Sequence, residues 1–158
     1  MLKVLKSIFD IMAAVLTGIL VIPLVPEIFG INTYCIQSGS MEPILETGSL
    51  IFTMKPKDIK IGDIITFQKW DIPVTHRVVD IQNGMYVTKG DANGKEDQGG
   101  ILEKELLGKV LKMPGDRYCI PYMGYIHTLI SQWKWGIMGI LVSYILLRKS
   151  DRKKDMIC

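Results

Sequence analysis

Two long apolar segments lie at the ends of the chain, and a stretch of mixed polar and apolar residues separates them. Residues 8–31 contain only two charged side chains, Asp10 and Glu27, and residues 135–147 contain none. A bilayer span needs about 20 consecutive apolar residues. The first segment meets that length, and the second meets it when residues 125–134 are added. The pattern therefore predicts an N-terminal transmembrane anchor at 8–31 and a C-terminal transmembrane segment at 125–147.

The middle of the chain, residues 32–124, has the short apolar runs and turn residues of a β domain. Asn83-Gly84 stands between two apolar runs, and this dipeptide predicts a two-residue β-hairpin. Strands are expected at 50–54, 64–68, 74–80, 85–88 and 109–113, with a helical turn at 101–107. We therefore expect a mainly β fold, in which a small β domain is flanked by two transmembrane helices.

Basic residues cluster outside the two apolar segments. Lys3 and Lys6 precede the first segment, and residues 148–158 contain five cationic side chains. Cationic flanks stay on the cytoplasmic side of a membrane, where they also suit contact with anionic lipid headgroups. Both termini are therefore expected in the cytoplasm, with 148–158 as a basic tail and the β domain outside the cell membrane. Residues 27–134 contain 12 basic and 13 acidic side chains, a balance that argues against nucleic-acid binding.

The N-terminal segment has a second interpretation, because its basic and apolar regions are also those of a secretory signal peptide. A small-x-small cleavage site does not follow it, since the chain continues as Pro23-Leu24-Val25-Pro26-Glu27. A retained anchor is therefore favoured over a cleaved leader. Three cysteines do not form a disulfide framework. Cys158 lies in the expected cytoplasmic tail, and the sequence leaves open whether Cys35 and Cys119 pair.

Three polar motifs of the middle domain contain the residue types of a hydrolytic charge system. They are Ser38-Gly39-Ser40-Met41-Glu42-Pro43, Thr75-His76-Arg77 and Lys89-Gly90-Asp91-Ala92-Asn93-Gly94-Lys95-Glu96-Asp97. A serine hydroxyl becomes a nucleophile when a base takes its proton, and histidine is suited to that role near neutral pH. A carboxylate then orients the imidazole, and either aspartate of the third motif can supply it.

From about Leu16 to Gly124, the chain resembles type I signal peptidases through these three motifs. The similarity is to the ER-type branch in particular, which is also found in archaea and some Gram-positive bacteria. The resemblance implies a signal-peptidase-like β domain in which Ser40 is the nucleophile. It also implies His76 as the general base, at the position where the bacterial branch has lysine.

The same resemblance implies Asp97 as the third member of the triad, with Asp91 as the alternative acid. Ala92 and Glu96 depart from the usual residues of this motif, while both aspartate positions are kept. The backbone N–H of Ser40 and the hydroxyl of Ser38 are the implied donors of an oxyanion hole.

The expected function is that of a membrane-bound serine endopeptidase that removes signal peptides from secreted preproteins. Its expected partners are preprotein signal peptides and the lipid bilayer, and the need for accessory subunits is left open. No cofactor and no metal are expected, because His76 and His127 lack the spacing of metal ligands; His127 is expected at the membrane interface. A soluble self-cleaving relative is disfavoured because such enzymes use lysine as the base. The remaining alternative is a catalytically silent membrane-anchored β domain that binds a partner.

Overall fold

The computed structural model describes residues 2–21 and 25–155 of the chain. Contacts divide the chain into two compact units. One unit comprises residues 26–128 and contains the sheet. The other comprises residues 1–25 together with residues 129–158 and is helical where it is described.

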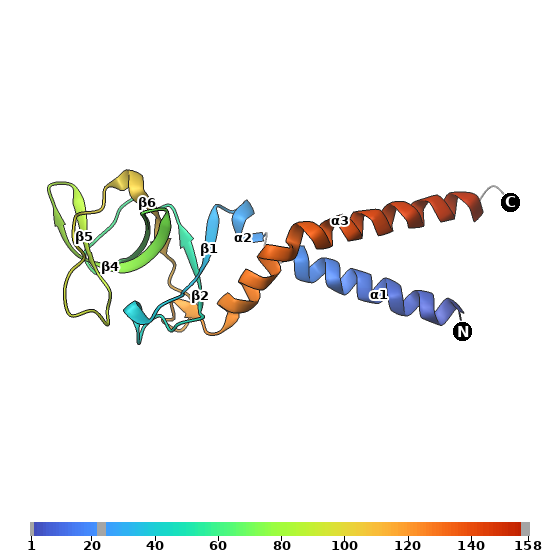
Figure 1. The fold of residues 1–158 in the computed structure, drawn as a ribbon, viewed down its shortest axis with the longest axis horizontal. Helices are drawn as coiled ribbons and strands as arrows, with labels where there is room; N and C mark the ends of the chain where they lie inside the picture. The colour runs from blue at the N-terminus through green and yellow to red at the C-terminus, as the bar shows by residue number, and fades with distance from the viewer. Residues whose placement is uncertain (1, 22–24, 156–158) are drawn as a thin grey trace. The chain divides into compact units, whose positions relative to one another are not determined.

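The sheet unit is built on one antiparallel sheet, whose strands curve around a common core (Figure 1). The strand order is β1-β2-β6-β3-β4-β5, and β7 pairs with β2 beside this path. The strands are β1 (Ile31–Cys35), β2 (Leu50–Met54), β3 (Ile64–Lys69), β4 (Ile72–Gln82), β5 (Met85–Lys89), β6 (Leu106–Val110) and β7 (Cys119–Ile120). The short helix α2 (Val25–Ile28) precedes β1, and the 3-10 turns η2 (Gly39–Met41) and η3 (Glu103–Glu105) lie between strands. The predicted mainly β fold is confirmed.

The core of this unit lies on both faces of β3, because successive side chains of a strand point to opposite sides. Ile64 packs in a cluster that includes Met41, whereas Ile65 packs in a second cluster with Val78. Phe67 belongs to the second cluster and is fully buried. Since β3 is buried on both faces, it fixes the position of its neighbour β4, on which one of the sequence motifs lies.

The expected strands 50–54, 64–68, 74–80 and 85–88 correspond to β2, β3, β4 and β5. The Asn83-Gly84 hairpin is also confirmed, with positive φ at both residues. The strand expected at 109–113 begins three residues earlier in the structure, where β6 occupies 106–110. Of the helical turn expected at 101–107, only the 3-10 turn η3 is present. Strands β1 and β7 were not predicted, because each is short and β1 carries Asn32 and Thr33 without regular alternation.

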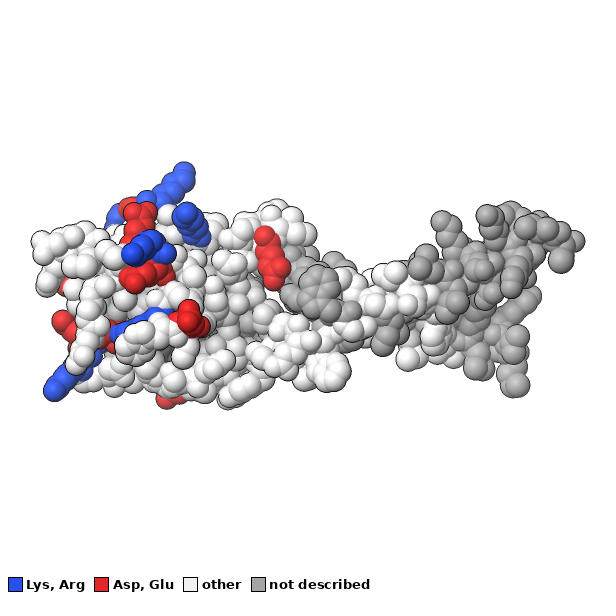
Figure 2. Space-filling model, turned by 45° about the horizontal axis from the view of Figure 1, so that its top comes forward, with Lys and Arg blue, Asp and Glu red and all other residues white. Residues whose placement is uncertain are grey.

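Charges of both signs are interspersed on the sheet unit. Figure 2 shows Lys and Arg side chains next to Asp and Glu side chains on one face. Ion pairs within this unit include Lys109 with Asp63 at 2.7 Å and Lys112 with Asp116 at 3.0 Å. The face drawn in Figure 2 therefore carries no field of a single sign over the sheet unit.

The helical unit contains α1 (Leu2–Val21) and the greater part of α3 (Met123–Asp155). Inside it, the ring of Phe9 meets that of Tyr144 edge-on at 5.0 Å. In the described part of the chain, no helix combines the length and the hydropathy required for a membrane span.

The predicted anchor 8–31 covers part of α1, all of α2, the first residue of β1 and residues 22–24, which lie outside the described residues. The predicted segment 125–147 lies within α3. The tail predicted at 148–158 is helical as far as Asp155, and its last three residues lie outside the described part. Membrane insertion of these segments stays a prediction.

Candidate active site

Ser40 lies on a loop whose two ends are joined by backbone hydrogen bonds and which is fixed to the core by a buried side chain. The amide of Ile36 donates to the carbonyl of Ser49 at 2.9 Å, and the amide of Gly48 donates to the carbonyl of Ile36 at 2.7 Å. Within the loop, Met41 belongs to the first core cluster and is 1% exposed. Because Ser40 precedes this buried anchor on the 3-10 turn η2, its hydroxyl is held in a defined place at the surface.

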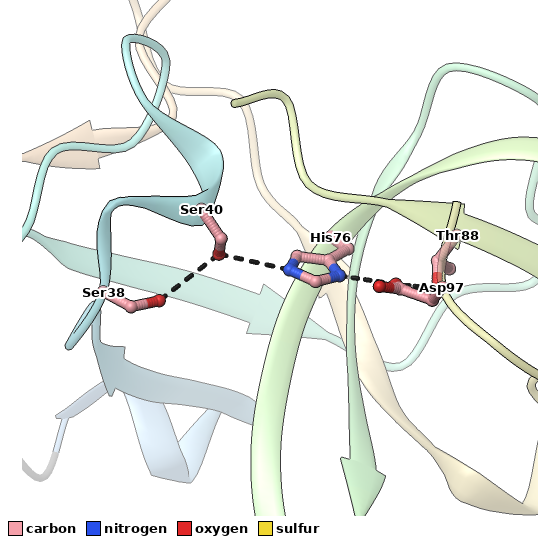
Figure 3. A network of polar contacts seen from close by, with 5 residues as sticks. All are labelled: Ser38, Ser40, His76, Thr88 and Asp97. Carbon is pink, nitrogen blue, oxygen red and sulfur yellow. Dashed lines mark hydrogen bonds and ion pairs between the residues drawn. The ribbon is translucent and has the colours of Figure 1, made fainter. Parts of the chain in front are cut away.

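His76 lies in β4, directly opposite Ile65 of β3, and is 7% exposed. Its ring meets the ring of Phe67 edge-on, with 6.3 Å between centroids. One ring nitrogen, Nε2, lies 3.1 Å from the Ser40 hydroxyl oxygen. The opposite nitrogen, Nδ1, lies 2.5 Å from Asp97 Oδ2. The imidazole therefore bridges a hydroxyl and a carboxylate, as Figure 3 shows.

Two hydrogen bonds with Thr88 of β5 hold Asp97 in place. Its amide donates to the carbonyl of Thr88 at 2.8 Å, and the Thr88 hydroxyl donates to Asp97 Oδ2 at 2.7 Å. Thr88 is fully buried. A carboxylate that accepts a bond from Nδ1–H leaves the lone pair of Nε2 free to accept the serine proton. The arrangement can therefore let the imidazole take a proton from the Ser40 hydroxyl, and Thr88 supports Asp97 in a way that the sequence did not reveal.

Asp91, the alternative acid, lies next to a different partner. Both of its carboxylate oxygens accept bonds from Arg77, one from Nε at 2.8 Å and one from Nη2 at 2.6 Å. The Arg77 side chain also donates to the carbonyl of Gly62 at 2.8 Å. Its hydrogen bond to Asp91 raises the pKa of Arg77, and the charge of that carboxylate adds to the effect. The structure thus brings Asp97 to His76 and leaves Asp91 in an ion pair that ties together β4, the turn before β3 and the loop after β5.

Ser38 lies beside the Ser40 hydroxyl, at the entrance of the loop. The two hydroxyl oxygens are 3.3 Å apart, and either can be the donor. Ser38 itself is exposed. The Ser38 hydroxyl and the backbone N–H of Ser40 belong to the same short loop. Two such donors can bind one substrate oxygen together, which is the requirement for an oxyanion hole.

A cleft of about 450 Å³ opens at these residues. Two chain segments, 34–38 and 72–76, form its walls, and Ser40, Met41 and Asn93 complete it. Strand β5 pairs with β4 only from Arg77 onward, and β1 pairs only with β2. Each wall therefore offers a strand edge without a partner strand in the described sheet, and such edges bind extended peptides.

Cys35 lies on the cleft wall, whereas neither His127 nor Cys119 is among the described residues that line the cleft. His127 Nε2 lies 2.9 Å from the Thr33 hydroxyl. Cys35 and Cys119 are free thiols. They belong to strands that flank β2 on opposite sides, and two strand spacings of about 4.8 Å exceed the reach of a disulfide.

Comparison with known proteins gives one family. Residues 8–122 match the family described as "Signal peptidase, peptidase S26". The human signal peptidase complex catalytic subunit SEC11C is 29% identical over 135 residues, which cover 73% of this chain and 67% of that protein. The SEC11 subunit of Scheffersomyces stipitis is 31% identical over 124 residues, covering 71% and 75%. The SEC11 subunit of Fusarium vanettenii is 32% identical over 129 residues, covering 68% and 72%.

The match includes the segments that carry all three motifs, and it confirms the resemblance to the ER-type branch of type I signal peptidases. The match also identifies the chain as a hydrolase, as expected for a signal peptidase. On this evidence, the chain belongs to the signal peptidase family, peptidase S26.

Proposed function

We propose that the protein removes signal peptides from secreted preproteins by serine endopeptidase chemistry, with Ser40, His76 and Asp97 as the catalytic triad. The observation that carries the proposal is the unbroken series of hydrogen bonds from the Ser40 hydroxyl through His76 to Asp97. Neither Ser38 nor Asp91 has a contact of this kind with the imidazole among the hydrogen bonds and ion pairs of the described residues.

In the first half of the reaction, Ser40 Oγ attacks the scissile carbonyl carbon and its proton passes to His76 Nε2. The carbonyl oxygen becomes an oxyanion, which accepts bonds from the Ser40 amide and the Ser38 hydroxyl. Asp97 stabilises the imidazolium through Nδ1–H. The C–N bond then breaks, His76 Nε2 gives its proton to the leaving amine, and the signal peptide stays esterified to Ser40.

In the second half, a water molecule takes the place of the amine. His76 accepts a proton from it while the water oxygen attacks the ester carbonyl. Collapse of this second tetrahedral intermediate breaks the ester bond and returns the proton to Ser40 Oγ. The enzyme is restored, and the signal peptide leaves with a free carboxylate.

The strand edges of the cleft support binding of an extended substrate segment. Residues 72–76 span four residue steps of about 3.3 Å each, so they accommodate roughly four substrate residues. The lining combines Tyr34, Ile36, Ile72, Pro73 and Val74, which suits the small apolar residues before a signal-peptide cleavage site.

We also propose that the helical unit anchors the enzyme in the membrane, with the sheet unit outside the cell and both termini in the cytoplasm. Exposed apolar side chains on α1 support membrane contact; they include Val4, Ile8, Phe9, Ile11, Met12, Val15 and Leu16. Cys158 offers a natural reporter of topology. In a Cys35→Ser/Cys119→Ser background, where Cys158 is the one remaining thiol, a membrane-impermeant maleimide should label the protein only after permeabilisation. Additional removal of Cys158 by Cys158→Ser gives the blank, and labelling of Cys158 in intact cells would contradict this orientation.

The relatives named above are catalytic subunits of a signal peptidase complex. We therefore propose preprotein signal peptides as substrates and leave room for accessory subunits as partners. Purification from membranes in mild detergent, followed by mass spectrometry of the intact assembly, tests that part. A monomer that cleaves preproteins at full rate would contradict a need for other subunits.

The experiment that tests the proposed reaction is cleavage of a radiolabelled preprotein by the full chain in detergent. Ser40→Ala and His76→Ala should each abolish processing. Ser49→Ala is the matched control, because the buried Ser49 hydroxyl makes no hydrogen bond with any described residue and its removal should leave activity intact. Processing that persists in Ser40→Ala would remove Ser40 as the nucleophile, whereas a wild-type chain that cleaves no preprotein would favour the silent β-domain interpretation.

A further inference from the structure

Asn93 has a carboxamide that the proposed triad does not use. It lines the same cleft as Ser40 and His76 and is half-buried. Its backbone amide donates to the carbonyl of Gly90 at 2.9 Å, whereas its side chain makes no hydrogen bond within the described part of the chain. A carboxamide has two donor hydrogens and an acceptor oxygen, so it presents unused bonding capacity to whatever fills the cleft.

The Asn93 side chain lies close to the backbone of Ser40. A Cβ atom placed on Gly90 would lie 2.5 Å from the Ser40 carbonyl oxygen and 2.7 Å from Asn93 Nδ2. Both atoms therefore lie around one small space that only glycine leaves open. The amide of Ala92 also donates to the Ser40 carbonyl at 2.9 Å, so the loop that carries Asn93 is fixed against the residue that performs the attack.

The register of β4 and β5 places the loop that carries Asn93 beyond His76, as seen from the free edge at residues 72–76. Lys89, the last residue of β5, pairs with Arg77, one residue beyond His76 along β4. The loop from Gly90 to Asp97 starts next to this pair of residues. It ends beside it again, since the Asp97 amide donates a hydrogen bond to the carbonyl of Thr88, the neighbour of Lys89. The free edge at residues 72–76 lies on the other side of His76. A peptide along that edge would therefore pass Ser40 and His76 before it reached Asn93.

The two ends differ in chemistry. The strand-lined end is mainly apolar, whereas the loop at the other end contains Asp91, Asn93, Lys95 and Glu96. The signal-peptide side of a preprotein is apolar up to the cleavage site, and that side suits the strand-lined end. The residues released with the new amine would then lie against the loop.

On the basis of the proposed function, we propose that Asn93 is a substrate-positioning residue that binds the backbone of the preprotein on the leaving-group side of the scissile bond. The carboxamide pairs with the peptide group of the first or second residue after that bond. This contact holds the amine nitrogen in line with His76 Nε2 while the C–N bond breaks. It has no role once the amine has left, because the acyl-enzyme no longer contains those residues.

The test compares two substrates on the same enzyme preparation. One is a preprotein peptide that extends several residues beyond the cleavage site, and the other is its signal-peptide segment alone as a p-nitrophenyl ester. Asn93→Ala should lower kcat/KM for the first by about 5- to 100-fold, since a buried peptide group then loses its partner. It should leave kcat/KM for the ester within about twofold. The ratio of the two values is independent of the fraction of correctly folded enzyme.

Gln37→Ala is the matched control, because Gln37 carries the other carboxamide on the cleft wall, at the strand-lined end. It should lower both values by the same factor and leave their ratio unchanged. An Asn93→Ala variant that loses activity equally on both substrates, or a Gln37→Ala variant that changes the ratio as strongly, would overturn the inference. Ser40→Ala in the same assay separates the two proposals: if it still cleaves both substrates, the proposed function fails, whatever Asn93 does.

Discussion

The sharpest prediction concerns Asp97, because the sequence offered two aspartates and the structure distinguishes them. In Asp97→Asn, the carboxylate opposite His76 Nδ1 becomes a carboxamide of nearly the same size. The amide NH2 group can donate to Nδ1, which favours the tautomer with its proton on Nε2. That proton would then face Ser40 Oγ, and His76 could no longer accept the serine proton.

The size of the effect follows from the geometry of the pair. Nδ1 and Oδ2 are 2.5 Å apart, and the two side chains are only 9% and 14% exposed, so water does not substitute for the lost carboxylate. In serine proteases with this arrangement, the corresponding substitution lowers kcat by roughly 10⁴-fold. We expect a decrease of roughly 10³- to 10⁴-fold here, or about 4–5.5 kcal/mol of transition-state stabilisation.

The assay is steady-state cleavage of a fluorogenic preprotein peptide, with melting temperatures measured in parallel. Asp91→Asn is the matched control, since it makes the same change six residues earlier in the same loop. It breaks the partly buried pair with Arg77, whose side chains are 27% and 18% exposed. We expect a loss of about 1–3 kcal/mol of stability and a melting temperature lower by roughly 5–15 °C.

The two variants should therefore differ in kind. Asp97→Asn should keep its melting temperature within about 3 °C and lose activity, whereas Asp91→Asn should melt earlier and keep at least about a tenth of its kcat at low temperature. The reverse pattern, with Asp91→Asn folded and inactive and Asp97→Asn active, would refute the assignment.

Three further substitutions test the rest of the site. Ser38→Ala should lower kcat by about 100-fold with little change in KM, because an oxyanion donor acts in the transition state; an unchanged kcat would remove Ser38 from that role. Thr88→Val should lower kcat/KM about 10-fold, since it removes the hydroxyl that bonds to Asp97 Oδ2, and calorimetry should show that the variant is folded. Gly90→Ala should lower both kcat and the melting temperature, because its Cβ would lie 2.5 Å from the Ser40 carbonyl oxygen; normal values for both would show that this contact relaxes freely.

The sequence alone was sufficient to nominate Ser40 and His76, because their motifs resemble those of the signal peptidase family, and the structure places the two side chains within 3.1 Å of each other. Strands β2 to β5 were equally accessible, since apolar runs ended at turn residues such as Asn83-Gly84. These signals lie within short stretches of sequence, and the strands form where the signals predict them.

The choice between Asp91 and Asp97 was not local. It depends on a loop that leaves β5 at Lys89 and doubles back until the Asp97 amide meets Thr88, and no periodicity in the sequence reveals that return. The role of Arg77 was missed for the same reason, because its partner comes from a different strand connection. Strand β1 was missed because five residues with mixed polarity, INTYC, gave no alternation.

The most direct test of the account is to trap the covalent intermediate. A preprotein peptide is mixed with the enzyme, quenched in acid within milliseconds and digested, and the adduct is located by mass spectrometry. The proposed mechanism predicts that the signal-peptide acyl group is found as an ester on Ser40 in the wild type and is absent in Ser40→Ala. Cleavage without any adduct, combined with normal turnover of Ser40→Ala, would contradict it.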